Sequence, residues 1–68
     1  MYTFNYSRDN CSAVIIENGF EVTTIVANER MAAGFVRWLN CVSPQNPGAE
    51  QIGLWFMRFV ESNPSLEG

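Results

Sequence analysis

The side chains best suited to chemistry in this chain are two cysteines and seven carboxylates, and they are spaced as isolated groups. Histidine, the commonest general base and nitrogen ligand for metals, does not occur. Cys11 and Cys41 lie too far apart in the sequence to form a zinc-binding pair. Glu17 and Glu21 flank a turn, where carboxylates are normally solvated. The sequence therefore indicates a protein without catalytic activity, bound metal or other cofactor.

The surroundings of the two cysteines show nothing that would activate a thiol. A reactive cysteine needs a neighbouring base or positive charge, and neither is evident beside Cys11 or Cys41. The N-terminal stretch MYTFNYSRDN lacks the basic and apolar segments of a signal peptide. We therefore expect a cytoplasmic, reducing location in which both thiols are free and buried. One disulfide is arithmetically possible and stays open as the alternative.

The charge balance argues against nucleic acids and membranes as partners. The formal net charge is −3, and the four basic residues are all arginines. Proteins that bind phosphates or anionic membranes usually carry a basic patch. The longest apolar run, from Ile52 to Val60, is far shorter than the roughly 20 residues that span a bilayer. The sequence thus predicts neither association.

The first part of the chain has the alternation and composition of β-strands. Residues 2–7 alternate between apolar and polar types, and residues 11–17 and 20–26 are rich in β-branched side chains. Asn18 and Gly19 separate the last two segments, and this pair is typical of a type I′ hairpin turn. The pattern predicts a three-stranded antiparallel meander in which the first strand lies beside the second.

The two-residue turn also predicts which side chains share each face of the hairpin. It fixes a register in which Ile15 lies opposite Val22. In that register Val14, Ile16 and Ile25 gather on the outer face, away from any helices that cover the other side. Clusters of exposed apolar residues often mark an interface, so these three residues are candidates for a contact surface.

The second part of the chain has the period of two amphipathic helices. Residues 28–42 begin with Asn28 as a predicted N-cap, and residues 49–62 end before Asn63 and Pro64. Asn46, followed by proline, is the predicted cap of the second helix. The expected core stripes are Met31, Phe35, Trp38, Leu39 and Val42 in the first helix, and Ile52, Trp55, Phe56, Phe59 and Val60 in the second.

The order of the elements defines the fold class. Three strands followed by two helices predict an α+β domain in which both helices pack on one face of the sheet, a β-β-β-α-α arrangement. We expect one domain over residues 1–63 and a flexible C-terminal tail over residues 64–68.

The second helix is more apolar than one contact with a sheet requires. Leu54 lies on its polar side, and Met57 widens its apolar arc. Charged residues make up only 16% of the chain, against a usual share of about 25%, which leaves few charges to cover such a surface. Leu54, Met57 and Arg58 are therefore the leading candidates for an interface with a protein partner or with a second copy in a homodimer.

The segment Val14–Asn40, VIIENGFEVTTIVANERMAAGFVRWLN, combines a hairpin with a capped helix that ends in Leu-Asn. In this pattern the chain resembles small accessory proteins encoded by bacteriophages and prophages. The resemblance implies a protein that acts by binding host proteins or nucleic-acid machinery, and it assigns no particular residues. It favours a protein–protein interaction module that modulates a host protein.

The alternative is a nucleic-acid-binding regulator. Tyr2, Phe4 and Tyr6 would form a stacking platform on the sheet, or residues 20–26 would form the ribbon of a ribbon-helix-helix dimer. The first arrangement needs a basic groove, and the second would present Glu21 and Ile25 to DNA, which are poor readers of bases. The simpler interpretation of the three aromatic residues is a structural one, in which they pack against the helices.

Overall fold

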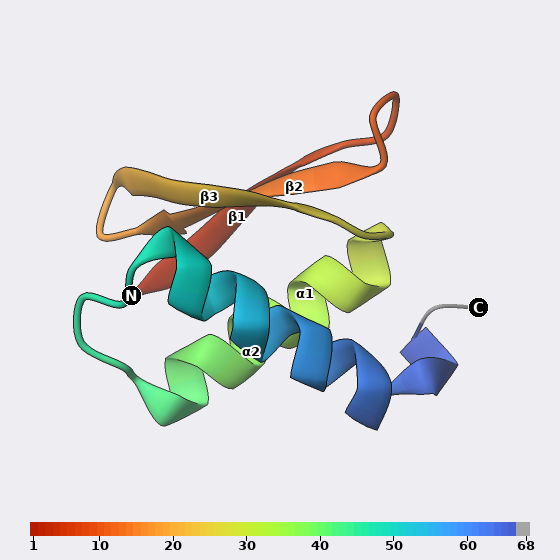
Figure 1. The fold of residues 1–68 in the computed structure, drawn as a ribbon. Coiled ribbons are helices and arrows are strands. Elements are labelled where there is room, and N and C mark those ends of the chain that lie inside the picture. The colour runs from red at the N-terminus through yellow and green to blue at the C-terminus, as the bar shows by residue number, and fades with distance from the viewer. Residues whose placement is uncertain (67–68) are drawn as a thin grey trace.

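The strands come first along the chain and pair as the predicted meander, with the order β1-β2-β3 (Figure 1). The structure is a computed structural model, and it describes residues 1–66. The elements are β1 (Tyr2–Ser7), β2 (Ser12–Glu17), β3 (Phe20–Val26), α1 (Glu29–Val42), α2 (Ala49–Ser62) and a short 3₁₀ helix, η1 (Pro64–Leu66). The predicted β-β-β-α-α arrangement is confirmed. The rest of the expected tail, residues 67 and 68, lies outside the described residues.

The turn between β2 and β3 has the conformation that its two residues favour. Asn18 and Gly19 have φ angles of 50° and 89°. Positive φ at both central positions defines the type I′ turn, whose twist matches that of the flanking strands. Glu17 accordingly pairs with Phe20, as predicted.

A β-bulge in β3 changes the faces of the hairpin beyond the turn. Ile16 pairs with Glu21, but Ile15 pairs with Thr23, so Val22 is an extra residue between two regular pairs. Because side chains alternate between the two faces of a strand, the extra residue moves every later side chain of β3 to the face opposite the one that a regular register would give it. The prediction that Ile25 lies on the outer face is therefore wrong.

The consequence of the bulge is an exchange of neighbouring side chains between the core and the surface. Ile25 pairs with Ala13 and is 5% exposed, whereas Val26 is 80% exposed. A regular register would have turned Thr24 inward, where its hydroxyl would need a hydrogen-bond partner. The bulge instead places an isoleucine in the core, which buries more apolar surface.

The helix starts differ in how they are capped. The side-chain oxygen of Asn28 accepts a hydrogen bond of 2.7 Å from the backbone N–H of Met31, which confirms the predicted cap of α1. The N-cap of α2 is Gly48, and it has no side-chain capping bond. The prediction that Asn46 caps this helix is wrong, because α2 begins at Ala49, beyond its reach.

Both helices lie on the same side of the sheet, so the molecule has two layers (Figure 1). Helix α1 packs against β1 and β2, whereas α2 packs against β3. None of the helices among residues 1–66 has the length and apolar character needed to cross a membrane. The buried side chains that form the core are Tyr2, Ala13, Ile15, Ile25, Ala32, Phe35, Val36, Leu39 and Ile52.

The cysteines are free, as expected, but the prediction that they are buried is wrong. Cys11 and Cys41 are both exposed. Cys11 precedes β2 in a turn with a φ angle of 48°. Cys41 follows the buried Leu39 by two residues, which turns it to the opposite side of α1.

An asparagine on α1 fastens the first strand to the helix layer. The Asn40 side-chain oxygen accepts a 2.7 Å hydrogen bond from the Tyr2 backbone N–H, and its amide nitrogen donates one of 3.0 Å to the Tyr2 carbonyl. The Tyr2 hydroxyl lies 3.1 Å from Glu17 Oε2 and 3.2 Å from the Pro44 carbonyl oxygen. Tyr2 thus connects β1 to β2, to α1 and to the loop that follows α1.

The surroundings of Tyr2 predict a loss of stability at high pH. Burial, followed by the hydrogen bond to Glu17 and its negative charge, raises the pKa of Tyr2 from 10.0 to about 12. Folding therefore favours the protonated phenol, and this contribution is complete below pH 10 and disappears as the pH rises through 12. Urea denaturation across this range should show the stability advantage of wild type over Tyr2→Phe shrinking. Parallel curves for the two proteins would contradict the prediction.

Candidate functional site

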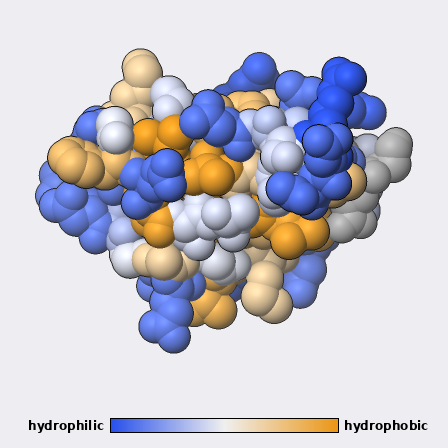
Figure 2. Space-filling model, turned by 90° about the horizontal axis from the view of Figure 1, so that it is seen from above, coloured by the Kyte–Doolittle hydropathy of each residue, from blue (hydrophilic) through white to orange (hydrophobic). Residues whose placement is uncertain are grey.

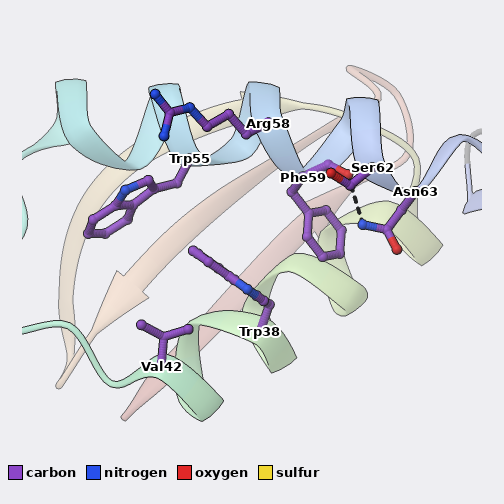
Figure 3. A pocket seen from close by; sticks show the side chains of 7 residues that line it. All are labelled: Trp38, Val42, Trp55, Arg58, Phe59, Ser62 and Asn63. Carbon is purple, nitrogen blue, oxygen red and sulfur yellow. Dashed lines mark hydrogen bonds between the residues drawn. The ribbon is translucent and has the colours of Figure 1, made fainter.

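An open apolar groove lies between α1 and α2. Figure 3 shows it from the side opposite the sheet, with Trp55 and Phe59 pointing from α2 toward Trp38 on α1. The cavity has a volume of about 500 Å³. We call it the aromatic groove, and its lining residues are Trp38, Val42, Trp55, Arg58, Phe59, Ser62 and Asn63.

Contacts among aromatic rings hold the walls of the aromatic groove in place. Trp38 and Trp55 meet edge to face, with ring centroids 6.0 Å apart and an interplanar angle of 69°. Trp38 also stacks on the fully buried Phe35 at 5.8 Å. Because Phe35 fixes one side of Trp38, the indole can present its free surface to a ligand without losing its orientation.

The polar groups of the groove stand at its rim. Arg58 is exposed, and its side chain runs along α2 rather than into the groove (Figure 3). The Asn63 side chain donates a 2.9 Å hydrogen bond to the Phe59 carbonyl oxygen, which satisfies a free carbonyl at the end of α2. Arg58 is therefore the charged group available to a bound molecule, and it favours an acidic one.

The side of α2 that faces away from the core carries the interface residues expected from the sequence. Leu54 and Met57 are 55% and 62% exposed, and Arg58 is exposed beside them. A second hollow, of about 540 Å³, lies on this side and is lined by Glu50, Gln51, Gly53, Leu54 and Met57. Their exposure agrees with the sequence analysis, and their role in an interface stays a prediction.

The structure does not bring the other candidate residues together with these. Val14 and Ile16 are half-buried on the outer face of the sheet, on the opposite side of the molecule from the helices, and Ile25 is in the core. Figure 2, which looks onto this face, shows hydrophobic patches separated by less hydrophobic residues. The exposed Val26 takes the place that the sequence analysis gave to Ile25.

Sequence reasoning assigned the walls of the groove to the core. Trp38, Trp55 and Phe59 lie on the predicted stripes but are only half-buried, and Val42 is 52% exposed. The sequence feature that could have indicated their partial exposure is the presence of two tryptophans at the margins of the stripes, since a residue of this size is rarely buried completely.

Residues 1–66 show neither a cluster of metal-ligating side chains nor an exposed aromatic platform on the sheet. Among residues 1–66, no three or more cysteine, aspartate or glutamate side chains gather closely enough to hold a metal ion. Tyr2, Phe4 and Tyr6 pack against the core and therefore do not form an exposed stacking platform on the sheet. The aromatic groove and two further hollows are mainly apolar, whereas a hollow beside Tyr2 and Asn40 is about half polar.

The fold and the site together define a small α+β domain with an apolar groove between its two helices. In comparisons with known proteins, no family model, no curated protein and no solved structure matches the chain.

Proposed function

We propose that the protein is a small, non-catalytic protein–protein interaction module of the cytoplasm, and that α2 provides its binding surfaces. The observation that carries this proposal is the shallow burial of α2. The helix is apolar along most of its length, yet Ile52 is its one fully buried side chain. Apolar surface left open in this way is a common mark of a binding site.

The aromatic groove is suited to the apolar side chains of a protein segment. Trp38, Trp55 and Phe59 offer large, rigid apolar surfaces, and Trp and Arg are the residue types that most often dominate binding energies. Arg58 at the rim favours a ligand with an acidic residue beside its apolar ones. The net charge of −3 makes a nucleic-acid backbone a poorer ligand than such a segment.

The resemblance to phage and prophage accessory proteins supports a protein of a bacterial host as the natural partner. In that setting, binding in the groove would modulate the host protein by occluding a surface or by holding it beside another component. The partner segment would be recognised by its pattern of apolar and acidic residues.

A displayed library of random peptides tests the groove directly. Peptides selected on the wild-type protein should combine two or more large apolar residues with a nearby Asp or Glu. Trp55→Ala should weaken their binding roughly 30-fold, since truncating a central aromatic residue costs about 2 kcal/mol or more. Arg58→Glu should weaken it by about tenfold through charge repulsion. Titration calorimetry measures both values.

Two matched variants serve as controls for this experiment. Phe20→Ala removes an exposed aromatic ring at the hairpin tip, and Arg37→Glu reverses an exposed charge on α1. Neither residue lines the groove, so neither change should alter peptide binding by more than about twofold. Selected peptides that bind Trp55→Ala and wild type equally, with both proteins folded by circular dichroism, would refute the proposal.

A further inference from the structure

The exposed side of α2 carries opposite charges placed symmetrically about an apolar residue. Glu50, Leu54 and Arg58 follow one another at intervals of four residues and are all exposed. On an α-helix, positions i−4 and i+4 lie on either side of position i, one turn below and one turn above it. Together with Met57 we call these residues the α2 ridge.

This arrangement is complementary to itself. When two copies of a helix pack antiparallel about a two-fold axis through Leu54, each residue meets the one placed symmetrically on the other side of the axis. Glu50 of one copy then faces Arg58 of the second copy, and Arg58 faces Glu50, while the two Leu54 side chains meet on the axis. A contact of this type uses the same surface patch on both subunits.

We propose that the α2 ridge is a homodimer interface in which two copies of α2 pack antiparallel. A parallel pairing would place Glu50 against Glu50 and Arg58 against Arg58, and such like-charge contacts disfavour it. The charge pattern therefore favours a second copy of the protein as the partner, because that copy supplies the complementary charges by symmetry. It also favours the antiparallel orientation of the two helices.

The shape of α2 agrees with a close approach of this kind. The hollow of about 540 Å³ lies over the same part of the helix as the ridge. Gly53 lines it, and a Cβ atom built on this glycine would meet nothing within 4 Å. The hollow therefore offers space for the Leu54 and Met57 side chains of the second copy.

The proposed interface is small, and Arg58 is the one residue that it shares with the aromatic groove. A contact between two single helices lies at the low end of specific interfaces, so we expect a dissociation constant on the order of 100 µM. Trp38, Trp55 and Phe59 lie outside the ridge, so the dimer would leave the aromatic walls of both grooves open while it engages Arg58 at their rims. This inference does not depend on the proposed function, and either can fail without the other.

Sedimentation equilibrium over a range of concentrations tests the pairing. The mass should rise from the monomer value of 7.7 kDa toward twice that value between about 10 µM and 1 mM. Glu50→Arg and Arg58→Glu should each weaken the dimer at least tenfold, because each opposes like charges twice. The double variant carrying both changes should restore the wild-type constant. Leu54→Glu, which sets two carboxylates against each other on the axis, should leave a monomer.

Helix α1 supplies a matched control for the charge reversals. Glu29 and Arg37 have the same spacing and the same charges as Glu50 and Arg58, the glutamate again lies in the first turn of its helix, and both residues are exposed. Glu29→Arg and Arg37→Glu should leave the dissociation constant unchanged. A wild-type protein that stays monomeric at 1 mM would overturn the proposal. So would a dimer that the single reversals do not weaken, or one that the double reversal does not restore.

Discussion

Phe35→Ala should abolish cooperative folding or leave a domain with little residual stability. Phe35 is fully buried, and its ring contacts Phe56 at 5.1 Å and Phe59 at 5.5 Å, measured between ring centroids. It is therefore the point where α1 holds both α2 and the aromatic groove. Truncating a buried phenylalanine to alanine costs about 3–5 kcal/mol.

The size of the domain makes this loss decisive. At roughly 0.05–0.15 kcal/mol per residue, a domain of 68 residues has a total stability of about 3–10 kcal/mol. Urea denaturation followed by tryptophan fluorescence measures the change, and Phe20→Ala is the control because Phe20 is exposed. A loss below about 1 kcal/mol for Phe35→Ala would show that the core does not depend on this ring.

Asn40→Ala should have the second largest effect, and the sequence gives no hint of it. The change removes the donor and the acceptor that satisfy the backbone N–H and carbonyl of Tyr2. Leaving a partly buried polar group without a partner costs about 1–3 kcal/mol. We expect a total loss of about 2–4 kcal/mol, together with a loosening of β1 from α1.

Hydrogen exchange distinguishes this explanation from a general loss of stability. The Tyr2 amide should lose its protection in Asn40→Ala, whereas amides at the centre of the β2–β3 hairpin should exchange faster only in proportion to the loss of global stability. Asn5→Ala is the control, since Asn5 is exposed on β1. Retention of Tyr2 protection in Asn40→Ala would contradict the role of the side-chain hydrogen bonds.

Local features of the sequence were enough to predict the elements of this fold. Asn18 and Gly19 predict the hairpin because few other pairs of residues adopt positive φ at both central positions of a turn. Asn28 marks the start of α1 because its side chain satisfies a free backbone N–H. Leu54 could be recognised as exposed because helical periodicity places it on the polar side of α2, and Met57 because it widens the apolar arc beyond what one contact with the sheet requires. These signals act over a few residues and need no knowledge of distant contacts.

The errors arose where a distant contact outweighs a local preference. Val22 forms a bulge because this places Ile25 in the core beneath β3. Burying Ile25 stabilises the fold more than the regular pairing, which would place Thr24 there. In the sequence, Asn40 has the pattern of a polar surface residue. Its role depends on a contact with Tyr2 in β1, 38 positions earlier in the chain. Trp38 belongs to the core stripe of α1, and its exposure depends on where α2 crosses.

The sequence by itself determined the class of the domain, its strand and helix order and the apolar excess of α2, because patterning and turn chemistry are local. The tertiary structure decided which apolar residues remain at the surface. Two helices on one face of a three-stranded sheet cannot bury every side chain of their stripes, and the position of α2 across α1 and β3 selects those left open. That packing turned Trp38, Trp55 and Phe59 from expected core residues into the walls of a groove.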